Sequence, residues 1–168
     1  MVDGDAEGGV TLRPMEYADL PFLIDVRNEC REFLHDDRAF TLDECRRWFL
    51  QSRPDFWVIM SRGQRVGYVR LSRHDTLHAS IYVGADLHKQ FRGRGFAKAA
   101  YAELFSFLLQ QRGIRCVLLE VLSHNVRALR LYEVLGFVEI GRRKQYCLRD
   151  DVPVDSIVMR KVLAVDAR

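Results

Sequence analysis

The pattern of apolar and polar positions predicts that strands and helices alternate along the chain. Apolar residues recur at helical spacing in residues 18–34, 41–52 and 125–136, so each of these segments is expected to bury one face of a helix. Runs rich in β-branched and aromatic residues lie between them and are typical of strands. The expected order is β-α-α-β-β-β-α-β-α-β-β, a mixed α/β sheet in one domain with a strand-helix-strand unit near its middle.

Boundary signals support this order. Thr41 and Glu44 have the spacing of a capping box, and Gly136 follows the last predicted helix, where a left-handed cap is favoured. The expected strands cover residues 10–15, a hairpin over 55–75 that turns at 61–64, and then 76–87, 114–122, 137–148 and 155–163, while a further helix ends near residue 112.

Length and composition fit one globular domain. The chain has 168 residues, of which 48% are hydrophobic and 29% charged. Residues 1–9 are acidic and rich in glycine, unlike a secretory signal, and are expected to be a disordered leader before a domain at 10–168. No apolar run approaches the length of a membrane span, so no membrane partner is expected.

The cysteines argue against a metal site or a disulfide framework. They are widely spaced, with no C-x-x-C pair, and are expected to be buried free thiols: Cys30, Cys45, Cys116 and Cys147. A cytoplasmic location is the corresponding expectation. A net charge of +3 is small, and the basic residues lack interleaved aromatics, so nucleic-acid binding is not expected.

The segment "HKQFRGRGFAKAAYAELF", residues 88–105, leads through glycines into an amphipathic helix. The first amides of a helix lack partners within it and carry the positive end of its dipole, so they bind anions. Gly93 and Gly95 let the backbone approach a phosphate closely. A dinucleotide-binding fingerprint is disfavoured because Lys98 occupies its third glycine position, and the G-K-[ST] of a Walker loop is absent.

Two motifs together carry a resemblance to a known family. "RGRGFA", residues 92–97, fits the pattern R/Q-x-x-G-x-G/A, and "NVRALRLYEVLGF", residues 125–137, is close to N-x-x-A-x-x-L-Y-x-x-x-G-F. In this order and spacing the chain resembles the GNAT superfamily of acetyl-CoA-dependent N-acetyltransferases over residues 10–163. The resemblance implies a mostly antiparallel sheet of about seven strands, with one splayed parallel pair and helices on both faces.

The resemblance also implies a cofactor site for acetyl-CoA, without a metal. Loop amides would bind the pyrophosphate, and the end of the preceding strand would pair with the pantetheine arm. Asn125 would touch the coenzyme, although as a helix N-cap it needs no cofactor. The implied contacts are Ala85, Asp86, Leu87, Arg92, Gly93, Arg94, Gly95, Phe96, Ala97, Lys98 and Asn125.

Two residues are candidates for the chemistry. By spacing alone Tyr132 is a core aromatic, but the resemblance makes it the proton donor to the departing thiolate. Glu120 lies inside the apolar run "CVLLEVL", where a carboxylate needs a cleft or a partner. It is either the base that takes the amine proton or a structural acid.

The acceptor is the least determined part of the prediction. Arg27, Asn28, Arg31 and Trp48 resemble the acceptor-site pattern of acetyltransferases acting on amino sugars, some of them nucleotide-linked. A small-molecule primary amine is therefore expected. Two alternatives stay open: a protein N-terminal or lysine acetyltransferase, and a CoA-binding sensor without turnover. The resemblance also allows for a homodimer through the closing strands.

Overall fold

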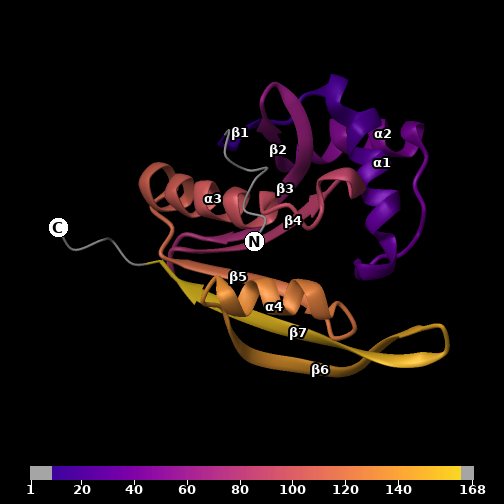
Figure 1. Ribbon diagram of the computed structural model, residues 1–168, viewed down its shortest axis with the longest axis vertical. Coiled ribbons are helices and arrows are strands. Elements are labelled where there is room, and N and C mark those ends of the chain that lie inside the picture. The colour runs from indigo at the N-terminus through magenta and orange to yellow at the C-terminus, as the bar shows by residue number, and fades with distance from the viewer. Residues whose placement is uncertain (1–8, 164–168) are drawn as a thin grey trace.

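A computed structural model describes residues 9–163 of the chain. Seven strands and four helices follow one another in the predicted order (Figure 1). The predicted leader falls outside the described residues except for Gly9, whose carbonyl accepts a hydrogen bond from the Ser61 hydroxyl at 3.0 Å. Within the described part of the chain, no helix is long and apolar enough to cross a membrane.

The elements have the following bounds. The strands are β1 (Thr11–Pro14), β2 (Asp55–Ser61), β3 (Gln64–Asp75), β4 (Ser80–Leu87), β5 (Cys116–Leu122), β6 (Val138–Arg149) and β7 (Val152–Val162). The helices are α1 (Leu20–Cys30), α2 (Leu42–Ser52), α3 (Phe96–Arg112) and α4 (Val126–Val134).

All seven strands form one sheet in the order β1-β2-β3-β4-β5-β7-β6. Every neighbouring pair is antiparallel except β4 and β5. This parallel pair is joined only where Ser80–Tyr82 lies beside Cys116–Leu118, so the two strands separate toward their carboxyl ends. The predicted mixed sheet with a splayed parallel pair is confirmed.

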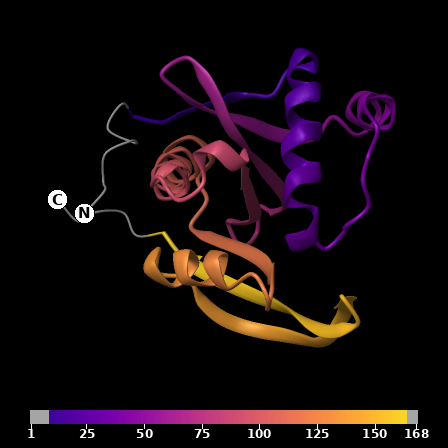
Figure 2. The same cartoon turned by 45° about the vertical axis from the view of Figure 1, so that its right-hand side comes forward.

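The sheet separates two hydrophobic cores, one on each face. Alternate residues of a strand point to opposite faces, and accordingly Val58 packs in the core with α1 and α2, whereas Ile59 packs in the core with α3. On β3, Tyr68 and Val69 divide in the same way. Figure 2 shows α1 and α3 on opposite sides of the strands. Helix α4 packs with the α3 core through residues that include Leu131.

Three predicted boundaries are wrong. Residues 76–79 form a turn rather than the start of a strand, because the Asp75 carboxylate accepts hydrogen bonds from the amides of Leu77 and His78. The long helix expected over 18–34 ends at Cys30 and continues as a single 3-10 turn.

The third wrong boundary concerns the closing hairpin. The sequence places its loop over residues 149–153, but only Asp150 and Asp151 lie outside the strands, both with positive φ, as a type I′ turn requires. Pro153 is tolerated within β7 because β5 pairs no further than Ser156, so Pro153 has a neighbour on one side only.

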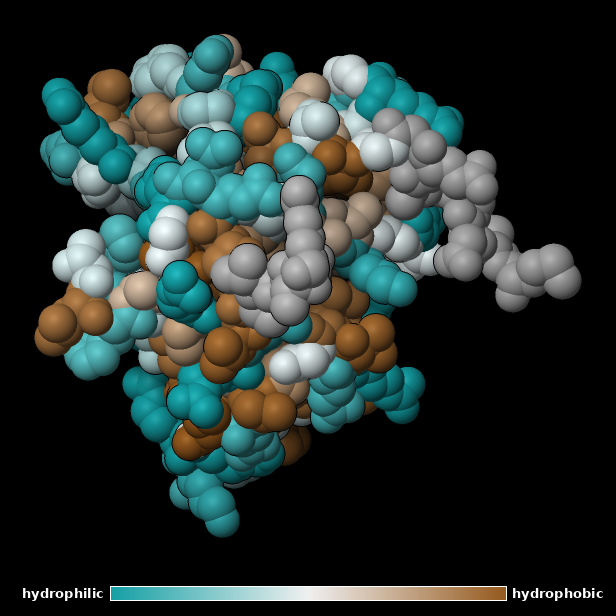
Figure 3. All heavy atoms as spheres, turned by 90° about the vertical axis from the view of Figure 1, so that its left-hand side faces the viewer, coloured by the Kyte–Doolittle hydropathy of each residue, from teal (hydrophilic) through white to brown (hydrophobic). Residues whose placement is uncertain are grey.

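Strand β6 is an edge of the sheet, and several of its apolar side chains are exposed. Val138, Ile140 and Leu148 are each more than 40% accessible. Figure 3 shows one side of the molecule, on which hydrophobic and hydrophilic residues are interspersed. Hydrophobic residues are frequent in its lower half, which is at the same height as α4, β6 and β7 in Figure 1. The homodimer allowed for by the sequence remains a prediction.

Candidate active site

The separation of β4 from β5 leaves a strand end with open backbone groups. The amide of His88 bonds the carbonyl of Val66 on β3. Because successive amides of a strand alternate in direction, the amide of Leu87 faces away from β3, toward the gap. The Leu87 carbonyl accepts a hydrogen bond from the Arg92 guanidinium at 3.0 Å, which holds the following loop against the strand end.

The loop after β4 turns sharply into α3. Gly93 and Gly95 have φ angles of 77° and 81°, a left-handed conformation that other residues rarely adopt. Gly95 is the N-cap of α3 and offers no side chain to the first amides of the helix. The amides of Phe96, Ala97 and Lys98 therefore lack intrahelical partners, as an anion site requires.

Ala97 and Lys98 border a cavity of about 470 Å³, which we call the amide cavity. It lies between the end of β4, the loop, the start of α3 and one face of α4. Most of the predicted cofactor contacts line it: Ala85, Asp86, Leu87, Arg92, Gly93, Gly95, Ala97, Lys98 and Asn125. Arg94 and Phe96 do not, since Phe96 is buried in the core and Arg94 donates to the Gln90 carbonyl. The Asn125 side chain caps α4 through the Ala128 amide.

A second cavity of about 360 Å³, the charged cavity, adjoins the first. It is lined by arginines and carboxylates from β3, β4, β5 and the loop after α1. The two cavities have six lining residues in common: Phe33, Ala85, Asp86, Asn125, Ala128 and Tyr132. A ligand in one cavity can therefore reach a ligand in the other.

Tyr132 lies at this junction. Its ring packs edge-on against Tyr101 and Phe137, with centroid distances of 5.7 Å in both cases. The Tyr101 hydroxyl donates to the Tyr132 oxygen at 3.4 Å, which leaves the Tyr132 proton available to another acceptor. Burial raises the pKa of the Tyr132 phenol, so it stays protonated across the neutral range.

Glu120 lies in the charged cavity, and both its carboxylate oxygens are engaged. Oε1 accepts a hydrogen bond from Arg73 at 2.7 Å, and Oε2 accepts one from Arg143 at 3.2 Å. His35 Nε2 lies 3.8 Å from the same carboxylate. The side chain of Glu120 is only 17% exposed, so this cluster satisfies a carboxylate that would otherwise be costly to bury.

His35 lines the charged cavity from the loop after α1. Its Nε2 lies 2.8 Å from the buried Ser156 hydroxyl. Burial lowers the pKa of His35, and the positive charges of Arg143, Arg70 and Arg149 act in the same direction, against the opposing charge of Glu120. The imidazole is therefore neutral at pH 7.

Asp86 and Arg70 form an ion pair on the floor of the charged cavity, with Oδ2 of Asp86 3.2 Å from the guanidinium. The guanidinium lies against Gly84, where a β-carbon would come within 2.6 Å of it. Arg70 Nε and Asp86 Oδ2 are buried without a hydrogen-bond partner. The Asp86 side chain thus belongs to the ion pair.

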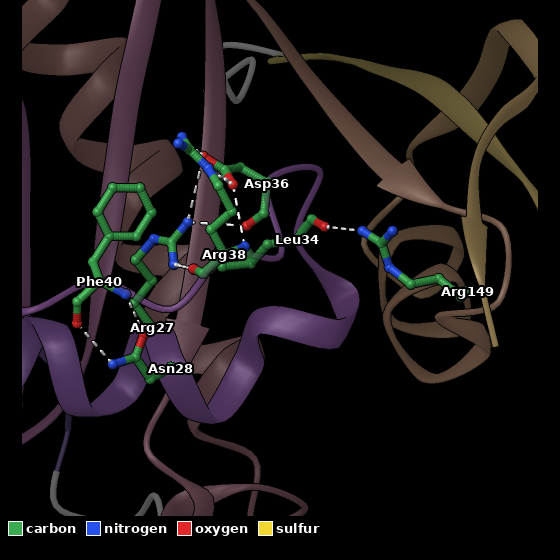
Figure 4. A network of polar contacts seen from close by, with 7 residues as sticks. All are labelled: Arg27, Asn28, Leu34, Asp36, Arg38, Phe40 and Arg149. Carbon is green, nitrogen blue, oxygen red and sulfur yellow. Dashed lines mark hydrogen bonds and ion pairs between the residues drawn. The ribbon is translucent and has the colours of Figure 1, made fainter.

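Figure 4 shows the predicted acceptor residues Arg27 and Asn28 bonded to the loop of residues 34–40, and residues 34–36 of this loop line the charged cavity. Arg27 donates to the carbonyls of Asp36 and Arg38 at 2.9 and 2.6 Å, and Asn28 exchanges hydrogen bonds with the backbone of Phe40. From the opposite side, Arg149 of β6 donates to the Leu34 carbonyl at 2.8 Å. The loop of residues 34–40 is thereby fixed to both α1 and β6.

Of the four predicted acceptor residues, only Arg27 lines the charged cavity. Asn28, Arg31 and Trp48 line neither cavity, and Trp48 packs against Phe49 and Phe56. The residues of the charged cavity that sequence reasoning missed include His35, Arg70 and Arg73. For Arg70 a signal exists, because it lies inside the apolar run "GYVRL" just as Glu120 lies inside "CVLLEVL".

Comparison with known proteins agrees with this geometry. The model of the acetyltransferase (GNAT) family matches residues 20–137, which include α1, the loop before α3, Tyr132 and Phe137. The chain therefore belongs to the acetyltransferase (GNAT) family. The predicted family is confirmed.

Individual relatives differ in their acceptors. N-acetylaspartate synthetase of Rattus norvegicus is 31% identical over 93 residues, which cover 55% of this chain but only 31% of that protein. The ribosomal protein bS18-alanine N-acetyltransferase of Escherichia coli (strain K12) is 24% identical, and the match covers 89% of this chain and 95% of that protein.

Among solved structures, spermidine N-acetyltransferase from Vibrio cholerae in complex with CoA and spermine is similar with a TM-score of 0.85. The match covers 92% of this chain and 95% of that one at 21% identity. At this identity the similarity establishes the fold, and the acceptor has to be inferred from the residues of this chain.

Proposed function

We propose that the protein transfers the acetyl group of acetyl-CoA to the primary amine of a small molecule by direct attack in a ternary complex. The observation that carries the proposal is the junction of the amide cavity and the charged cavity at Tyr132. Acetyl-CoA in the first cavity would present its thioester to an amine in the second. Holding two reactants in this way is itself a large part of catalysis.

The residues of the amide cavity fit acetyl-CoA. Gly93 and Gly95 form a close, left-handed backbone turn, and the unpartnered amides of Ala97 and Lys98 can donate to a diphosphate. The inward-facing amide of Leu87 can donate to the thioester carbonyl, whose oxygen gains negative charge during attack. Burial raises the pKa of Cys30, which also lines this cavity, to about 12, so its thiol is not a nucleophile at neutral pH.

Tyr132 is the proposed proton donor to the leaving thiolate. It is protonated at neutral pH, lies where the two cavities meet, and accepts a hydrogen bond from Tyr101 that leaves its own proton free to transfer. The departing sulfur is most basic as the C–S bond breaks, and a phenol can protonate it at that point.

His35 is the proposed base that takes the amine proton. Glu120 is the candidate that the sequence suggests, but both its carboxylate oxygens are already engaged, since they accept hydrogen bonds from Arg73 and Arg143. His35 lines the same cavity and is neutral at pH 7. Glu120 then has a structural role, which is to position the two arginines.

The charged cavity favours a small acceptor. Its volume is about 360 Å³, and the loop of residues 34–40, fixed by Arg27 and Arg149, closes one side of it. A protein N-terminus is the second candidate, because the match to the bacterial bS18-alanine N-acetyltransferase spans 95% of that protein.

A thiol-release assay tests the proposed function. The purified protein with acetyl-CoA is assayed against amino sugars, amino acids, polyamines and a peptide that begins with alanine. Acceptor-dependent release of CoA from a small amine is the expected result. Release with the peptide alone supports the second candidate. Binding of acetyl-CoA without release from any acceptor would make the protein a CoA sensor instead.

Replacing His35 with glutamine is expected to lower kcat at pH 7.5 about 10²-fold, the lower end of the usual contribution of a general base. The pKa of His35 lies below its ordinary value of about 6.5. The kcat of the unmodified protein should therefore stay constant above about pH 6.5 and decrease at lower pH, where His35 becomes protonated. The variant should lose this acidic limb. The measurement is kcat at saturating acceptor from pH 5 to 9.

Two variants serve as controls for His35. His78→Gln removes an exposed histidine that pairs with Asp75 outside both cavities and should leave the profile unchanged. Glu120→Gln should retain the acidic limb. An acidic limb that persists in His35→Gln but disappears in Glu120→Gln would return the role of base to Glu120.

A further inference from the structure

We infer that the acceptor amine carries a carboxylate or phosphate group, which is bound by the guanidiniums of Arg73 and Arg143 at the charged cavity. This inference rests on the proposed acetyl transfer and specifies the class of acceptor. It differs from what the structural similarity to a spermidine acetyltransferase alone would indicate, because a polyamine carries only positive charge.

The balance of charge around the charged cavity is the first argument. Three arginines, Arg27, Arg70 and Arg73, line it together with three carboxylates, Asp36, Asp86 and Glu120, and two further arginines, Arg38 and Arg143, pair with these carboxylates from outside the lining. Each carboxylate is already paired: Asp36 with Arg38, Asp86 with Arg70, and Glu120 with both Arg73 and Arg143. A polyamine would find no unpaired carboxylate there, and the excess of positive charge would repel it.

The second argument is the fixed position of the two arginines. The Arg73 guanidinium lies 4.5 Å from the centre of the Tyr82 ring, and that of Arg143 lies 4.5 Å from the centre of the Tyr146 ring. The Glu120 carboxylate accepts one hydrogen bond from each guanidinium. An arginine has five N–H donors in a planar fork that suits carboxylate and phosphate oxygens.

Exposure places these donors where an acceptor can reach them. The Arg73 and Arg143 side chains are 60% and 54% exposed, whereas that of Glu120 is 17% exposed. The guanidiniums therefore stand between solvent and the buried carboxylate. The positive surroundings also favour the neutral form of the attacking amine, because nearby cations lower the pKa of an ammonium group.

Matched acceptor pairs test the inference by thiol release. L-Aspartate is compared with its diamide, which carries no carboxylate, and glucosamine 6-phosphate with glucosamine, so that a carboxylate and a phosphate are tested separately. Spermidine and a peptide beginning with alanine complete the set. At least one anionic acceptor is expected to exceed its neutral partner by about ten- to a hundredfold in kcat/KM, the range for charged hydrogen bonds.

Variants assign the preference to the two arginines. Arg73→Gln and Arg143→Gln should each reduce the anionic-to-neutral ratio of kcat/KM about tenfold or more. The matched control is Arg46→Gln, which removes a surface arginine paired with Asp43 on α2, outside both cavities, and should leave the ratio unchanged. Spermidine, the peptide or a neutral amine as the best acceptor would overturn the inference.

A binding measurement separates this inference from the proposed function. With CoA at saturation to fill the amide cavity, glucosamine 6-phosphate or L-aspartate should raise the melting temperature of the unmodified protein and not that of Arg73→Gln. If no acceptor releases thiol but this difference is seen, acetyl transfer fails while the anion site stands. Equal rises in the two proteins, or no rise in either, would refute the anion site.

Discussion

Replacing Tyr132 with phenylalanine is expected to lower kcat about 10³-fold, within the range for loss of a general acid, while affinity for acetyl-CoA changes less than about threefold. The phenyl ring keeps the contacts with Tyr101 and Phe137, so the fold and the amide cavity are preserved. The substitution removes the hydroxyl group, and with it both the proton that would reach the leaving sulfur and the 3.4 Å contact with the Tyr101 hydroxyl. The measurements are kcat from thiol release and the dissociation constant of CoA from titration calorimetry.

Tyr101→Phe is the matched control for this prediction. Tyr101 is buried beside Tyr132 and lines the same amide cavity. The substitution Tyr101→Phe also removes one phenolic hydroxyl. It donates to the Tyr132 oxygen, so its removal should lower kcat by less than about tenfold, the effect of one neutral hydrogen bond. Equal losses of kcat in the two variants, or a loss of CoA affinity in Tyr132→Phe that matches the loss of kcat, would show that Tyr132 acts in binding and not as the acid.

The local parts of the fold could be predicted because a few neighbouring residues determine them. The capping box of α2 forms as expected, with Glu44 bonded to the amide and hydroxyl of Thr41. Asn125 caps α4, and Gly113 ends α3 with a φ of 65°. In each case the required hydrogen bond or backbone conformation involves residues close in sequence.

The amide cavity was accessible to sequence reasoning for the same reason. The part that we propose binds the diphosphate is a single loop and the first turn of the helix that follows, so it consists of consecutive residues, 92–98. Tyr132 and Asn125 come from one further motif. By contrast, the wrong strand start at residue 76 depended on one side chain, Asp75, which bonds the backbone of the turn.

The charged cavity could not be predicted because it is assembled from distant segments. Glu120 on β5 meets Arg73 on β3 and Arg143 on β6, which are 47 and 23 residues away in the sequence. His35 reaches Ser156 across 121 residues. The order of strands in the sheet determines these contacts, and no spacing rule within one segment reveals them. The hydrogen bonds of Arg27 and Asn28 are to the loop of residues 34–40, which closes one side of the charged cavity, and their role toward an acceptor remains a prediction.

Replacing Gly95 with glutamate is expected to abolish the rise in melting temperature caused by acetyl-CoA. A ligand at 100 times its dissociation constant stabilises a protein by about 2.7 kcal/mol, which for a domain of this size corresponds to roughly 5–10 °C. Gly95 is the N-cap of α3 at the mouth of the amide cavity. A carboxylate there would occupy the space beside the free amides of the helix and repel the diphosphate. The measurement is thermal unfolding with and without the ligand.

Gly113→Glu separates the loss of binding from backbone strain. Gly113 lies at the opposite end of α3 and also has a positive φ, and a β-carbon added there would have no neighbouring atom within 4 Å. Both variants should lose about 1–2 kcal/mol of stability because a side chain is forced into the left-handed region, yet only Gly95→Glu should lose the response to acetyl-CoA. Gly95→Gln, which has the same strain without the charge, should retain part of it. A full response in Gly95→Glu would mean that the diphosphate binds elsewhere, and the assignment of the amide cavity to acetyl-CoA would then be untenable.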